Sequence, residues 1–240
     1  MKVTSVNIDT KAKLSLEHRL AHNKLEVVMH RKCITLSAPD DEMHNAFTEL
    51  SRIPITKIPQ SMARLEPGGV VGDKHFSEDI IRRHDDGMFY KVSVYTQVSI
   101  MSKERYHELN QLYSKNIQAG QFGENIQVEG IKSIESLSQG TVIQLGESAQ
   151  IKIGHLRTFC YKFANVIFPT VESYFNWKKS NNGRVINKIG VLGQVLVGGT
   201  VYPGDPITIV HSPKTHVPLG YIQRPHGIAS HTPCDPPTNT

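Results

Sequence analysis

The sequence is poor in cysteine and aromatic residues, and it contains no long apolar run. Its 240 residues include three cysteines, Cys33, Cys160 and Cys234, at spacings that match neither a disulfide framework nor a zinc site. No stretch of about 18 apolar residues occurs, so no membrane span is predicted. Residues 1–9 lack the apolar core of a secretory signal, and we expect a reducing, cytoplasmic location.

The charge and the aromatic content argue against nucleic acid as a partner. Lysine and arginine number 27 against 22 acidic residues, a formal charge of +5, and they form no basic block. Aromatic residues make up only 7% of the chain, which leaves few side chains on which bases could stack. The moderate positive charge by itself suits an anionic small ligand as well as a nucleic acid, and the missing basic block and the low aromatic share make a nucleic acid the lesser alternative.

Short strands separated by glycine turns dominate the middle of the chain. Residues 126–128, 141–145 and 149–153 have strand composition, and a glycine follows close behind each of them. This spacing predicts a barrel or a sandwich. Ser102, followed by apolar residues at helical spacing, predicts a helix that begins at residue 103 and continues to about residue 117.

The composition divides the chain into one β-rich domain and a tail. We expect residues 1–211 to form a single domain, in which residues 31–64 are a local insertion with a short helix. The last 30 residues contain six of the 13 prolines, and proline lacks the N–H group that a β-ladder needs. Residues 212–240 are therefore predicted to be an irregular tail, disordered from about residue 225.

Cys160 is the first candidate for chemistry. It follows the strand predicted at residues 149–153, and Arg157 and Lys162 flank it. Positive neighbours stabilise the thiolate, which is the form that acts as a nucleophile and binds metals. Most isolated cysteines are instead small buried apolar residues, and the spacing alone supports both interpretations equally.

Two glycine turns supply further candidates. Residues 120–126 have the sequence Gly-Gln-Phe-Gly-Glu-Asn-Ile, in which two glycines three positions apart allow backbone N–H groups to converge on an anion. Residues 72–75, Gly-Asp-Lys-His, form a second polar turn. Each of these patterns alone occurs more often as an ordinary turn.

Taken in order, these segments resemble the MOSC domain family, which is related to the C-terminal part of molybdenum cofactor sulfurases. The segments are Gly69 to His75, Phe122 to Ile126, Arg157 to Cys160, and Gly190 to Gly193 leading to Val197 to Asp205. The resemblance covers residues 3 to 210 and implies a mainly β fold, a mostly antiparallel β-barrel with peripheral helices. The chain departs from the family at Phe159, where a proline is usual, and in its longer 31–64 segment.

The resemblance also implies a site for the molybdenum cofactor. It implies Cys160 as a thiolate ligand to molybdenum, which is consistent with the preference of this metal for soft sulfur ligands. The stand-alone members reduce N-hydroxylated bases, so the implied activity is that of an oxidoreductase, with His75 or Glu124 as proton donor. The resemblance also implies an association with pyridoxal phosphate at the level of the family. The implied cofactor-binding residues are Asp73, Phe122, Gly123, Glu124, Asn125 and Arg157.

Three functions stay open at this point. A reductase needs a small N-hydroxylated substrate and a separate electron-donor protein, because no flavin, haem or iron–sulfur motif is visible in the sequence. A sulfur carrier would hold a persulfide on Cys160, loaded by a cysteine desulfurase. A binding module would hold the cofactor without turnover. None of the three is expected to involve a nucleic acid or a membrane.

Overall fold

The computed structural model describes the sheet core of the chain and part of its periphery. The described residues are 1–9, 40–51, 56–73, 75–76, 81–83, 89–91, 97–131, 133–157, 166–173, 176, 189–221 and 232–233. Cys33, Cys160 and Cys234 lie outside these ranges, as does Lys74. The roles expected of Cys160 therefore stay predictions.

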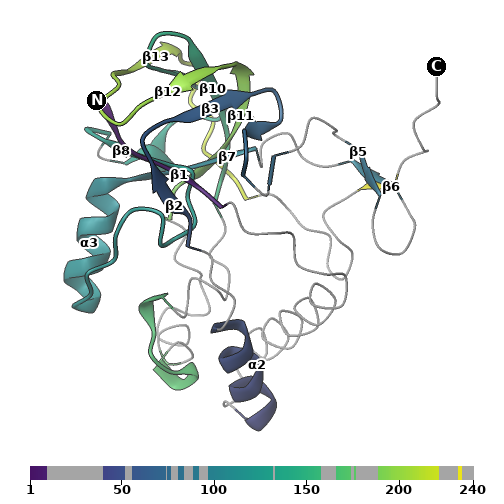
Figure 1. Ribbon diagram of the computed structural model, residues 1–240, viewed down its shortest axis with the longest axis vertical. Coiled ribbons are helices and arrows are strands. Elements are labelled where there is room, and N and C mark those ends of the chain that lie inside the picture. Colours follow the sequence, from purple (N-terminus) through teal and green to yellow (C-terminus); the bar gives the residue numbers. More distant parts are fainter. Residues whose placement is uncertain are drawn as a thin grey trace.

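An eight-stranded sheet is the largest sheet of the described residues, and its labelled strands lie together in the upper left of Figure 1. Its strands, in order across the sheet, are β13 (Ile207–His211), β9 (Val142–Leu145), β10 (Ala149–Leu156), β11 (Val191–Val197), β7 (Val98–Ser102), β8 (Ile126–Glu129), β1 (Lys2–Ile8) and β2 (Ile58–Gln60). Neighbouring strands are antiparallel except β7 and β8, which are parallel. The prediction of a mainly β, mostly antiparallel fold is confirmed.

The two halves of this sheet approach each other near the start of the chain. The N–H of Val3 donates to the carbonyl of Asp205 at 2.9 Å, and the N–H of Gly204 donates to the carbonyl of Val3 at 2.8 Å. Lys2 and Pro206 form an isolated antiparallel bridge. Among the described residues no continuous ladder joins β1 to β13, so the structure bears out a mixed sheet and not the closed barrel that the resemblance implies.

Alternating burial explains why the central strands form the core. In β10, Ala149, Ile151 and Ile153 are buried, whereas Gln150 and Lys152 between them are partly exposed. Successive side chains of a strand point to opposite faces of the sheet, so the apolar residues meet those of the adjoining strands on one face. Residues 149–153, which the sequence predicted to be a strand, therefore have one buried face.

Two small sheets and several helical segments accompany the main sheet among the described residues. α3 (Lys103–Tyr113) begins after Ser102, whose side chain accepts a hydrogen bond from the N–H of Arg105 at 3.2 Å, as the sequence predicted. It ends at residue 113, earlier than predicted, because Ser114 adopts a left-handed conformation with φ of 50°. None of the described helices is long and apolar enough to span a membrane. These elements are α2 (Asp41–Ser51), α3 (Lys103–Tyr113), β3 (Ala63–Glu66), β4 (Gly69–Val70), β12 (Gly199–Val201), β5 (Ile81–Arg83), β6 (Phe89–Lys91), β14 (Thr232–Pro233) and the 3-10 helix Ile134–Ser136.

Parts of the predicted insertion and of the predicted tail pair with other strands. β2 lies within the 31–64 segment and adds an edge strand to the main sheet beside β1. β14 lies within the 212–240 segment and pairs with β6, with Thr232 opposite Lys91 and Pro233 opposite Tyr90. Within the 31–64 segment, residues 58–60 therefore belong to the main sheet, and the prediction of a local insertion stays a prediction.

Candidate functional site

Asp73 lies at the centre of the candidate site, and its side chain is only 2% exposed. The ammonium group of Lys57 lies 2.7 Å from Asp73 Oδ2, in an ion pair that is buried on both sides. The same oxygen accepts hydrogen bonds from the backbone N–H of Asp9 at 3.0 Å and from Nδ2 of Asn125 at 3.1 Å. Oδ1 faces His75, whose backbone N–H and Nδ1 each lie 3.0 Å away. Asp73 therefore joins four segments of the chain.

The charged form of Asp73 is the stable one in the folded protein. Burial acts to raise the pKa of this carboxyl group, but the hydrogen bond from His75 and the positive charge of Lys57 outweigh burial and hold the pKa well below its usual range. We conclude that Asp73 is a structural carboxylate at neutral pH and does not donate a proton.

This low pKa predicts a dependence of stability on pH. Because the pKa of Asp73 is lower in the folded than in the unfolded chain, its contribution to stability is present above the unfolded value of about 3.9 and is lost as the pH falls below it. Asp73→Asn should therefore be less stable than the wild type at pH 7, and the difference should shrink below about pH 4. Urea unfolding at several pH values measures this. A difference that stays constant with pH would contradict the assignment.

Glu124 is fully buried, and three donors surround its carboxyl group. Oε1 accepts from the N–H of Gly120 at 2.6 Å and from Nδ2 of Asn7 at 3.4 Å, and Oε2 accepts from the hydroxyl of Tyr106 at 2.6 Å. Burial raises the pKa of Glu124, although the bonds from Tyr106 and Gly120 oppose the shift. Burial also raises the pKa of Tyr106 well above its ordinary value, so its hydroxyl remains protonated and donates. The buried carboxyl group of Glu124 therefore stabilises the 120–124 turn by its hydrogen bond from Gly120.

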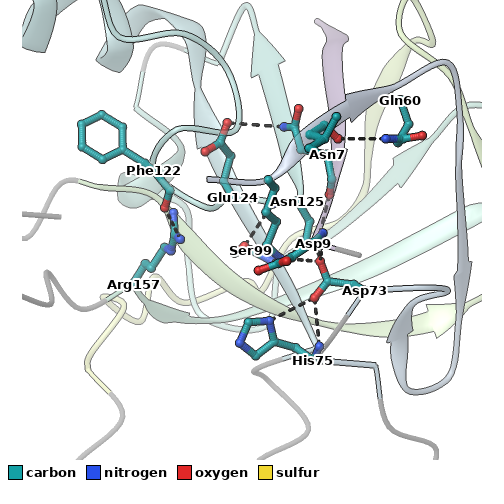
Figure 2. A network of polar contacts seen from close by, with 12 residues as sticks. Asn7, Asp9, Gln60, Asp73, His75, Ser99, Phe122, Glu124, Asn125 and Arg157 are labelled. Carbon is teal, nitrogen blue, oxygen red and sulfur yellow. Dashed lines mark hydrogen bonds and ion pairs between the residues drawn. The ribbon is translucent and has the colours of Figure 1, made fainter. Parts of the chain in front are cut away.

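Asn125 connects the two glycine turns that the sequence singled out. Its Oδ1 accepts hydrogen bonds from the N–H of Ser99 at 3.1 Å and from the hydroxyl of Ser99 at 2.9 Å. Its Nδ2 donates to Asp73, and its carbonyl accepts from the N–H of Asn7 at 2.7 Å. Figure 2 shows the resulting chain of contacts from Glu124 through Asn7 and Asn125 to Asp73.

Arg157 is a buried cation that follows the last residue of β10. Its Nη2 donates to the carbonyl of Phe122 at 2.5 Å, and its backbone N–H donates to the carbonyl of Gly190 at 2.9 Å. The ring of Phe122 is fully buried and packs against Tyr106 with ring centroids 5.3 Å apart. The end of β10 is thereby attached to the 120–126 turn.

The structure brings most of the predicted site residues together, but these residues differ in burial. Asp73, Phe122, Glu124 and Asn125 are buried, whereas the side chain of His75 is 57% exposed. Gly123 has a φ of 67°, and its N–H bonds to the carbonyl of Gly120, so it shapes the turn. Cys160 lies outside the described residues. The functional roles of all these residues stay predictions.

Lys57 is the site residue that the sequence pattern did not reveal. Besides its ion pair with Asp73, its backbone N–H donates to the carbonyl of Gly120 at 2.9 Å, so it contacts both turns. A Cβ atom at Gly120 would lie 2.3 Å from the carbonyl oxygen of Lys57, which explains the need for glycine there. Lysine is rarely buried without a partner, and no local pattern marks Lys57 as buried, because its partner lies in a distant turn.

Two basic and two acidic side chains lie in the described part of the site. Lys57 pairs with the carboxylate of Asp73. Arg157 donates to the carbonyl of Phe122, and its positive charge opposes the rise that burial causes in the pKa of Glu124. Guanidinium groups bind phosphate well, so the chemistry of Arg157 fits the phosphate of the molybdenum cofactor. Within the described ranges, no cluster of three or more histidine, cysteine or acidic residues could hold a bare metal ion.

Comparisons with known proteins agree with the resemblance seen in the sequence. The family model of the MOSC domain matches residues 74–208, more than half of the chain. YuaD from Bacillus subtilis has 18% sequence identity and a TM-score of 0.50, over 64% of this chain and 86% of that one. Two YiiM proteins, from Geobacillus stearothermophilus and Escherichia coli, are each 18% identical, with TM-scores of 0.48 and 0.47 over 69% and 67% of this chain and 69% and 68% of theirs. The likeness to YuaD shows a shared fold, and no curated protein matches the sequence.

Proposed function

The chain belongs to the MOSC domain family, and we propose that it binds the molybdenum cofactor and reduces N-hydroxylated bases or related N-oxygenated compounds. The observation that supports this most is the network that joins the 72–75 turn, the 120–126 turn and Arg157, because the resemblance implied these segments as the cofactor site. In the reaction, R–NH–OH takes up two electrons and two protons, the N–O bond breaks, and R–NH₂ and water leave. The cofactor, when bound, supplies the electrons at the N–O bond.

Two residues of the chain would hold the cofactor. Cys160 would provide a thiolate ligand to molybdenum, as the resemblance implies. Arg157, three residues earlier, would bind the phosphate with its buried guanidinium group. A separate electron-donor protein completes the proposal. The described residues give no argument for pyridoxal phosphate, and it is not part of the proposal.

The geometry favours His75 over Glu124 as the residue that delivers a proton. Glu124 is fully buried, and both of its carboxyl oxygens already accept hydrogen bonds. His75 is more than half exposed, and its Nδ1 faces the carboxylate of Asp73. Nδ1 therefore carries a hydrogen, and Nε2 is the nitrogen through which the ring would exchange a proton with a substrate.

Replacing His75 with glutamine tests this assignment. We expect the rate of reduction to fall about 10²- to 10⁴-fold, the usual contribution of a general acid, while the cofactor content stays at the wild-type level. The assay is reduction of an N-hydroxylated purine with a chemical electron donor, and His107→Gln on the exposed face of α3 is the matched control. A rate of reduction in His75→Gln equal to that of the wild type would remove His75 from the mechanism.

A sulfur carrier is the alternative that the same thiolate supports. Cys160 would then accept a sulfur atom from a cysteine desulfurase and hold it as a persulfide. Mass spectrometry after incubation with a desulfurase and cysteine distinguishes the two functions. A stable increase of about 32 Da on Cys160, without reductase activity, would favour the carrier. Cofactor binding with neither activity would indicate a binding module.

A further inference from the structure

We infer that residues 217–221, here named the C-terminal strap, position the end of β10 and with it the proposed cofactor site. The sequence predicted these residues to belong to an irregular tail with no assigned role. The functional half of this inference rests on the proposed function, whereas its structural half does not.

The strap lies beside the end of β10, beyond the residues that pair with β9. β9 pairs with β10 from Ala149 to Lys152 only. One residue further along, the N–H of Ile153 donates to the carbonyl of Thr141 at 2.8 Å. The N–H of Leu156 then donates to the carbonyl of Gly220 at 2.9 Å, and Leu156 forms a parallel bridge with Tyr221. The strap therefore supplies a backbone acceptor where β9 has already ended.

Two further contacts attach the strap to the sheet. At its first residue, the N–H of Gln139 donates to the carbonyl of Val217 at 2.8 Å, and the N–H of Val217 donates to the hydroxyl of Ser138 at 2.9 Å. Near its end, Leu219 is 8% exposed and packs within the main apolar core. Pro218 is compatible with this arrangement, because these bonds use the carbonyls of residues 217 and 220 and need no N–H from residue 218.

The strap contacts Leu156, and the next residue along the chain is Arg157 of the proposed cofactor site. Leu156, which the strap holds, pairs with Val191 on its other side, and Arg157 follows it directly. Arg157 then bonds to the carbonyls of Gly190 and Phe122. Releasing the strap would remove the acceptor of the Leu156 N–H and leave the end of β10 held from one side. We therefore expect Arg157 to lose its fixed position.

Two substitutions in the full-length chain test the strap. Leu219→Ala removes its apolar anchor, and Ser138→Ala removes the acceptor of the Val217 N–H. Leu196→Ala, at a leucine that is 42% exposed, is the matched control. We expect amide hydrogen exchange at Gln139 and Leu156 to accelerate about tenfold or more in both strap variants, with exchange at Ile143 in β9, between β13 and β10, unchanged. Leu219→Met should restore slow exchange.

The functional readout separates positioning from general stability. The strap variants should raise the KM for the N-hydroxylated substrate or lose cofactor during purification. Their melting temperatures should fall too little for unfolding to explain these losses. Exchange that rises equally at Leu156 and Ile143, or stays unchanged at Leu156, would overturn the inference. If Leu219→Ala does not fold, Ser138→Ala decides. If no variant and no wild-type protein reduces the substrate, the proposed function fails, and the exchange result still decides whether the strap holds β10.

Discussion

Replacing Lys57 with methionine should lower the free energy of unfolding by about 3–5 kcal/mol, because it leaves the carboxylate of Asp73 buried without its partner. Removing one partner leaves the other charge buried and uncompensated, which costs more stability than the intact ion pair contributes. Removing both partners costs less, because it also removes the cost of taking two charges out of water. Urea unfolding at pH 7 measures the loss. The effect should be large because both side chains are at most 3% exposed and water cannot replace the missing ammonium group.

Two controls show whether the effect belongs to the pair. The double variant with Lys57→Met and Asp73→Asn should be more stable than the sum of the two single changes predicts, because neither charge is left alone. Lys103→Met removes an ammonium group that is 55% exposed and pairs with Glu129 on the surface, and it should cost at most about 1 kcal/mol. Additive single effects would show that Lys57 and Asp73 are not coupled in the folded protein.

Replacing Cys160 with serine should lower the rate of N-hydroxylated base reduction by more than about 100-fold, because loss of a direct metal ligand should exceed the 10- to 100-fold cost of losing a residue that only supports one. Serine keeps the size of the side chain, but its hydroxyl does not ionise at neutral pH and is a harder ligand than a thiolate. The measurement is the reduction rate together with the molybdenum content of the purified variant.

Cys33→Ser and Cys234→Ser are matched controls for this experiment. Neither residue lies in the four motif segments that carry the resemblance to the MOSC family, and we expect both variants to retain the wild-type rate. Wild-type activity and molybdenum content in Cys160→Ser would exclude the thiolate as a ligand that reduction requires.

Local signals in the sequence predicted the parts of the structure that local physics decides. Ser102 caps α3 as its side chain chemistry predicts, and the alternation along residues 149–153 marks a strand with one buried face. The resemblance to the MOSC family, and not local physics, implied that the 72–75 and 120–126 segments belong to one site, and in the structure Asn125 joins the two turns by its bond to Asp73.

Contacts between distant segments could not be predicted in the same way. Lys57 is an ordinary lysine in the sequence, and only its place beside Asp73 makes it a buried cation. Glu124 accepts a hydrogen bond from Tyr106, eighteen residues earlier, and no local pattern in the sequence indicates this contact. The contacts of the strap were not predicted, because the six prolines of residues 212–240 indicate which backbone N–H groups are missing and not which of the remaining backbone groups find partners.

The proposed function depends most directly on the molybdenum cofactor being bound. The full-length chain should be purified from a host that makes this cofactor and analysed for molybdenum by mass spectrometry and for pterin by fluorescence. We predict about one molybdenum and one pterin per chain, and a marked loss of both in Arg157→Ala, because the phosphate loses its buried cation. A wild-type chain without molybdenum or pterin, purified beside a known molybdenum enzyme that retains both, would contradict the proposed function.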